Sequence, residues 1–198
     1  MGTAGALEES RSWLARDRRG VAVMLALALL IAVLSLAQGD AANAQTKVTK
    51  RASVTNMTRY EKRLAASINA TRKHHGLRTL KLAPGLMCSA GRHSLQMAVK
   101  GYFAHSSYNG ASFFARVSRF YGGGSSTLSA GENLLWAQPR VSPRQVVRRW
   151  LASPSHQAVL LSRSWRVFGV GVIKSTHGAG VFRGRTVLLV TADFAVKR

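Results

Sequence analysis

Acidic side chains are scarce in this sequence: Asp and Glu total 7 in 198 residues, against 29 Lys and Arg. Beyond residue 45 the chain holds only Glu61, Glu132 and Asp193. The formal net charge is +22 at pH 7, and a surface so basic attracts polyanions. The basic residues are spread along the chain and no nucleic-acid-binding motif is present. We therefore expect anionic cell-envelope polymers or lipids as partners, rather than nucleic acid.

Cysteine is almost absent, because Cys88 is the only one. A disulfide within the chain is therefore excluded. A nucleophilic cysteine needs an adjacent base, whereas Cys88 lies among small and apolar residues at helical spacing in "APGLMCSAGRHSLQMA". We expect it to be a small buried hydrophobic side chain.

Long apolar runs are also rare, and the one that stands out is residues 21–37, "VAVMLALALLIAVLSLA". An arginine-bearing segment precedes it and "ANA" at 42–44 follows it, which is the order of a secretory signal. We expect residues 1–44 to be a signal peptide and the protein to be secreted. The alternative is an uncleaved anchor, since 17 residues lie at the lower edge of a bilayer span. Residues 45–55 then form a basic linker, and 56–198 suit one domain.

Helix and strand patterns alternate along the domain. Helices are expected from Thr58 to Gly76, from Pro84 to Lys100, over 112–121, and after each of Ser142-Pro143 and Ser153-Pro154. Strands are expected over 132–138, 166–174 and 185–196. This pattern predicts an α+β fold.

Four residues receive a structural interpretation. Glu61 completes a capping box with Thr58. His93 falls on the apolar stripe of its helix and is expected to be a helix-face residue. The glycines at 169 and 171 predict close approach of another backbone to their strand.

Five blocks, in this order and spacing, resemble one family: "FAHSS" (103–107), "AGENLLW" (130–136), "VVRRWLASPSHQAVLL" (146–161), "FGVGV" (168–172) and "VTADFA" (190–195). The family is the CAP superfamily, also called SCP-like, which includes cysteine-rich secretory, antigen 5 and pathogenesis-related proteins. The sequence is most similar to its small bacterial extracellular branch, over about residues 56–196. The resemblance implies a three-layer α-β-α sandwich with a central antiparallel sheet.

The resemblance also implies a cleft with two histidines and two acids. His105 matches the histidine of "FAHSS", Glu132 the acid of "GEN", and His156 the histidine of "SPSHQ". Ser153 stands three residues after Trp150, where animal and plant members have a glutamate. The expected cleft is therefore a triad of two histidines and one glutamate, with Ser153 beside it.

This triad allows more than one chemistry. With His105, His156 and Glu132 as ligands, it would be the His₂Glu set of some zinc hydrolases. With Glu132 orienting one ring instead, two imidazoles and water would hold Zn²⁺ weakly. Glu132 cannot be both ligand and general base, so the sequence favours binding over catalysis.

Three functions remain open at this point. The first is a non-catalytic binding domain, whose cleft takes a divalent metal or a small or lipidic ligand and whose basic surface associates with the cell envelope. The second is a metal-assisted hydrolase or peptidase at the envelope. The third is a structural interaction module, in which the triad is only a hydrogen-bond network.

Overall fold

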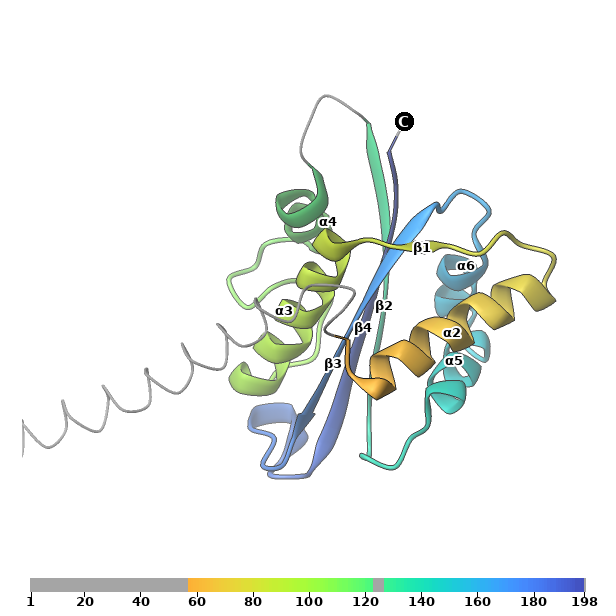
Figure 1. Ribbon diagram of the computed structural model, residues 1–198. Helices are drawn as coiled ribbons and strands as arrows, with labels where there is room; N and C mark the ends of the chain where they lie inside the picture. Colours follow the sequence, from red (N-terminus) through yellow and green to blue (C-terminus); the bar gives the residue numbers. More distant parts are fainter. Residues whose placement is uncertain (1–56, 123–126, 198) are drawn as a thin grey trace, which may run out of the picture. The chain divides into compact units, whose positions relative to one another are not determined.

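The computed structural model describes residues 57–122 and 127–197, which form a three-layer sandwich (Figure 1). A sheet lies in the middle. Helices α3 (Pro84–Lys100) and α4 (Phe113–Val117) cover one face, and a second layer of helices covers the other. That layer consists of α2 (Arg59–His74), α5 (Pro143–Leu151) and α6 (Pro154–Leu161). The α+β sandwich expected from the sequence is confirmed.

The sheet has four strands in the order β1-β3-β4-β2, so β2 lies at one edge. Strands β2 (Leu128–Ala137), β3 (Val167–Ser175) and β4 (Val187–Lys197) are antiparallel neighbours. The short β1 (Lys81–Leu82) pairs with β3 in parallel. The segment around β1 reads as a connector in the sequence, because two residues are too few for a periodic pattern.

Strand β4 is one of the two inner strands, and ten of its eleven residues are buried. Its near-continuous apolar run is typical of a strand covered on both faces. One core lies between the sheet and the layer of α2, α5 and α6, and includes Ile68, Trp150 and Phe194. The polar residues Thr191 and Asp193 in the middle of β4 therefore have no access to water, and this is important for Asp193 below.

Helix ends follow the capping signals of the sequence. The Thr58–Glu61 capping box is present, with the Thr58 backbone N–H donating to Glu61 Oε2 at 2.8 Å. Ser142 caps α5 in the same way. The helix expected over 112–121 is shorter than predicted: α4 ends at Val117 and continues as a π-helical turn, η2 (Ser118–Gly122).

Two glycines of β3 allow α3 to pack with its backbone directly on the sheet. A Cβ added at Gly169 would lie 2.2 Å from the carbonyl carbon of Leu86, and one at Gly171 would lie 2.2 Å from the Gly91 nitrogen. The predicted close approach is confirmed. Cys88, on the same helix, is only partly buried, so it is less enclosed than the small buried side chain that the sequence predicts. This partial burial raises the pKa of its thiol.

Within the described residues, no helix has the length and hydropathy needed to cross a bilayer. The predicted signal or anchor (1–44) and linker (45–55) lie outside this part of the chain. A short 3₁₀ turn in the connection between β3 and β4, η3 (Gly180–Phe182), completes the elements.

Candidate functional site

Glu132 lies on the edge strand β2 with its side chain fully enclosed. One oxygen, Oε1, lies 2.8 Å from Nδ1 of His105, which comes from the loop between α3 and α4. The His105 side chain is 56% exposed. A carboxylate oxygen only accepts, so Nδ1 of His105 donates, and in the neutral ring the lone pair lies on the other nitrogen, Nε2. His105 therefore presents a fixed ring with a basic nitrogen available to a ligand.

The other oxygen of Glu132 forms a short charge-assisted hydrogen bond with Nη2 of Arg116, on α4. The same guanidinium donates from Nη1 to the His105 carbonyl at 3.1 Å and to Ser107 Oγ at 3.3 Å. Arg116 is 8% exposed. Because a buried carboxylate is costly without a partner, Arg116 is what allows Glu132 to stay inside. It also ties the backbone of the histidine loop to the same carboxylate.

A second imidazole, that of His93 on α3, lies behind Glu132, with Nε2 4.0 Å from Oε2. Nε2 also lies 2.9 Å from the Ala104 carbonyl. A carbonyl cannot donate, so Nε2 carries the proton. Burial, with a smaller effect from Arg116, lowers the pKa of His93 to about 4. His93 is thus a neutral, buried residue of the helix face, where the sequence places it. It also positions the loop at Ala104.

Asp193 on β4 lies directly opposite Glu132 in the antiparallel ladder. It is fully buried, and Ser89 and Glu132 are the polar side chains placed to hydrogen-bond with its carboxyl. Burial raises the pKa of Asp193 well above its usual range, the charge of Glu132 raises it further, and Arg116 opposes them. Two adjacent carboxyls with one guanidinium favour a single negative charge. Asp193 is therefore the group that holds the proton, and Glu132 is not the isolated acid expected from the sequence.

This pairing makes stability depend on pH with a definite sign. A carboxyl whose pKa is higher in the folded state than in the unfolded chain binds more protons when folded. Its contribution is fully present below the unfolded pKa and is lost as the pH rises through the folded one. In urea titrations from pH 4 to pH 7, we expect the free energy of unfolding of wild type to fall relative to that of Asp193→Asn. Glu61→Gln, an acid-to-amide change in the capping box, is the control. If the free energy of unfolding of wild type instead rises relative to that of Asp193→Asn as the pH rises, the assignment of the proton to Asp193 is contradicted.

His156, in the first turn of α6, lies on the other side of the β2 edge and does not contact Glu132 through a hydrogen bond. Its Nδ1 lies 2.7 Å from Ser153 Oγ. Ser153 is the residue before α6, but its hydroxyl makes no capping bond to the helix. Burial, followed by the charge of His105, lowers the pKa of His156. Ser153, which the sequence predicts beside the cleft, contacts the His156 ring through its hydroxyl and orients that ring.

A metal in this cleft has a limited donor set. Both Glu132 oxygens already have partners, His105 and Arg116. Over 57–122 and 127–197, no group of three or more His, Cys, Asp or Glu side chains is placed to hold a metal ion. Glu132 orients His105 as carboxylates do behind metal-bound histidines, so the imidazoles of His105 and His156 are the side chains of the predicted set whose donors are not engaged by Arg116.

Sequence reasoning missed Arg116 and Asp193 as members of the site. Arg116 could have been found, because it shares an inward stripe of α4 with Phe113 and Val117, where a charged residue needs a partner. For Asp193 the only signal in the sequence was an acidic residue within a buried strand pattern. Its pairing with Glu132 depends on the register of β2 and β4. Because the two residues are 61 positions apart in the sequence, no local pattern predicts that register.

Comparison with known proteins places this geometry in a family. Residues 65–192 match the family described as "CAP: Cysteine-rich secretory protein family". The protein YkwD of Bacillus subtilis, described as uncharacterized, is 32% identical over 134 residues, which are 68% of this chain and 50% of YkwD. The chain thus spans about half the length of this curated relative.

Solved structures share the fold. An outer surface protein of Borrelia burgdorferi has a TM-score of 0.57 at 20% identity, covering 68% of this chain and 90% of its own. An extracellular SCP-domain protein of Bacillus anthracis has a TM-score of 0.54 at 24% identity, covering 68% and 39%. A cysteine-rich secretory protein of Staphylococcus aureus has 0.52 at 15% identity, covering 72% and 40%. The chain belongs to the CAP, or cysteine-rich secretory protein, family and is of the bacterial type.

Proposed function

We propose that this chain is an exported, non-catalytic binding domain. Its cleft, formed by His105, Glu132 and His156, takes a divalent ion or a small ligand, and its basic surface associates with the anionic cell envelope. Export is supported by the signal-like N-terminus and by the extracellular and outer-surface descriptions of two structural relatives. The net charge of +22 supports association with polyanions.

One observation carries the proposal for the cleft. A buried, arginine-paired Glu132 fixes the Nδ1 side of an exposed imidazole at 2.8 Å. The ring is therefore already held in place with its Nε2 lone pair available. Because the side chain need not be ordered on binding, a ligand loses little free energy to conformational entropy. His156, oriented by Ser153 and electrostatically coupled to His105, supplies the second donor. Zn²⁺ bound by two imidazoles would complete its shell with water or with an anionic group of a ligand.

Calorimetric titration with Zn²⁺ tests this proposal. We expect weak binding to wild type, loss of the heat in His105→Ala and His156→Ala, and binding about 10–100-fold weaker in Glu132→Gln, whose amide no longer holds His105 as a carboxylate does. His177→Ala removes an exposed histidine of the loop after β3 and is the matched control. Absence of heat in wild type, or an equal loss in His177→Ala, would count against a metal in the cleft.

The hydrolase alternative needs a base for metal-bound water. Glu132 is engaged by two partners and Asp193 is fully buried, so neither carboxylate is free for that role. We therefore favour binding. Catalysis would require turnover that disappears in both histidine variants.

A further inference from the structure

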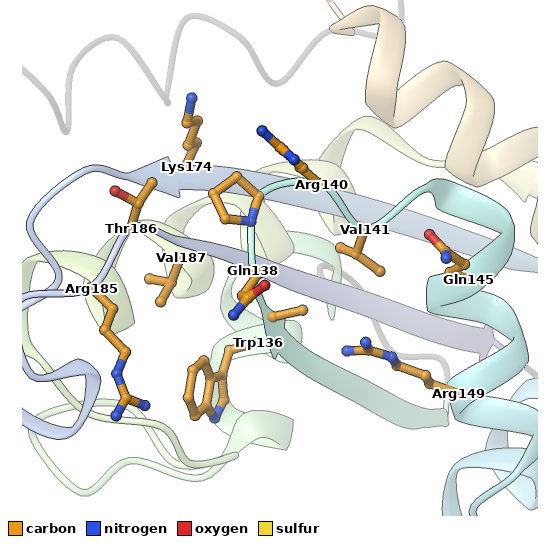
Figure 2. Close-up of a pocket in the computed structure, with 12 residues that line it drawn as sticks. Trp136, Gln138, Arg140, Val141, Gln145, Arg149, Lys174, Arg185, Thr186 and Val187 are labelled. Carbon is orange, nitrogen blue, oxygen red and sulfur yellow. The ribbon is translucent and has the colours of Figure 1, made fainter.

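A second concave site lies at the end of the sheet where β2 and β3 end and β4 begins. It is a cavity of about 1170 Å³, lined by the end of β2, the connection to α5, α5 itself and the facing ends of β3 and β4 (Figure 2). Trp136 and Glu132 are four positions apart on β2, about 13 Å along the strand. The cavity is therefore separate from the histidine cleft.

Its lining carries charge of one sign. Arg140, Arg149, Lys174 and Arg185 line it, and no Asp or Glu does. All four side chains are exposed, and none has an ion pair or side-chain hydrogen bond with another residue of the described domain. They surround the opening from different elements rather than forming a run along one helix (Figure 2). Arginine side chains in such a setting are suited to carboxylate or phosphate groups, which they bind in a bidentate manner.

The floor of the cavity is aromatic. The Trp136 ring is drawn between Arg185 and Arg149 in Figure 2 and is only half-buried. Phe182 fixes it from behind by an edge-to-face contact, with ring centroids 5.6 Å apart. The electron-rich face of an indole attracts the slightly positive C–H groups of a sugar ring. A rigid indole among unpaired cations is a combination that fits a sugar bearing negative charge.

We propose that this basic groove (Trp136, Arg140, Arg149, Lys174 and Arg185) binds an anionic polysaccharide. Its acidic groups contact the four cations, and one sugar ring packs on Trp136. The proposal rests on, and deepens, the proposed association with the envelope, because it replaces diffuse attraction with a defined groove. A concave site with an aromatic floor fits a polymer chain better than the flat array of headgroups at a lipid surface.

Two charge-matched triple variants test the role of the cations. Arg149→Gln/Lys174→Gln/Arg185→Gln alters the groove, and Arg63→Gln/Lys73→Gln/Arg163→Gln removes the same charge from exposed residues elsewhere. The probe is polygalacturonate, titrated into the full exported chain over a salt series. We expect the groove triple to bind roughly tenfold more weakly than the control triple and with a shallower salt dependence. An equal loss in both would overturn the groove while leaving envelope association intact, and no binding to wild type would overturn both.

A third variant separates sugar stacking from charge. Trp136→Leu should weaken binding to polygalacturonate severalfold and leave binding to inorganic polyphosphate, which has no sugar ring, unchanged. A single-stranded oligothymidylate and vesicles containing phosphatidylglycerol complete the series. Equal effects on polygalacturonate and polyphosphate would overturn the stacking role. Tighter, Trp136-dependent binding to the oligonucleotide or to the vesicles would overturn the assignment to a polysaccharide.

Discussion

Replacing Arg116 by methionine is expected to lower the free energy of unfolding by about 3–5 kcal/mol, because it leaves a buried carboxylate without its cation. The Glu132 side chain is enclosed, and besides Arg116 it is hydrogen-bonded to His105 at 2.8 Å. The same change removes two hydrogen bonds to the histidine loop, at the His105 carbonyl and at Ser107. Arg116→Met therefore reports on both the carboxylate and the loop, and urea unfolding at neutral pH measures the total.

The double variant Arg116→Met/Glu132→Gln separates these contributions. Neutralising Glu132 removes the unpaired charge, so the double variant should regain a large part of the stability lost in Arg116→Met. Arg119→Met, an exposed arginine one turn further along, is the matched control and should change stability by no more than about 0.5 kcal/mol. A loss below about 1 kcal/mol for Arg116→Met, or no recovery in the double variant, would contradict the pairing as the main stabilising contact.

Gly171→Ala is expected to cost about 3 kcal/mol or more, at the upper end of the range for overpacking. The added Cβ would lie 2.2 Å from the Gly91 nitrogen, and a helix backbone cannot rotate away as a side chain can. Helix α3 would have to move off β3, and the Ser94 hydroxyl would lose its bond to the Gly171 carbonyl at 3.0 Å. Because α3 carries His93, the Ala104 contact behind the cleft would move as well.

The effect should therefore appear in two measurements. Thermal unfolding should show the loss of stability, and the Zn²⁺ titration should show weaker binding than wild type even where the variant is folded. Gly122→Ala is the control, since a Cβ there lies 3.4 Å from the Ser118 Cβ, an ordinary contact. A variant Gly171→Ala as stable as Gly122→Ala would mean that α3 is not held against the sheet by the backbone contact seen here.

Local sequence patterns predicted most helices and strands of this fold, but they did not predict every residue of the site. The capping box at Thr58, the proline starts of α5 and α6 and the glycines of β3 all follow from short-range chemistry. His105 and Glu132 were expected to be neighbours from the family resemblance, and they are. The order of the strands could not be predicted from local sequence patterns, because it depends on which apolar faces pack together. The pairing of Asp193 with Glu132 and the position of β1 could not be predicted for the same reason.

His105 and His156 belong to elements on opposite sides of the sheet, one to the loop that joins α3 to α4 and the other to α6, and β2 is the edge strand between them (Figure 1). In the described domain the sheet joins these two layers, because α3 packs on β3 and β4 while α6 packs on β2 and α5. A ligand bound by both rings would therefore link the two outer helix layers to each other. By mass action, it would oppose the local opening of either layer as well as global unfolding. Occupancy of the cleft could then be followed as slower hydrogen exchange in α6 and α4.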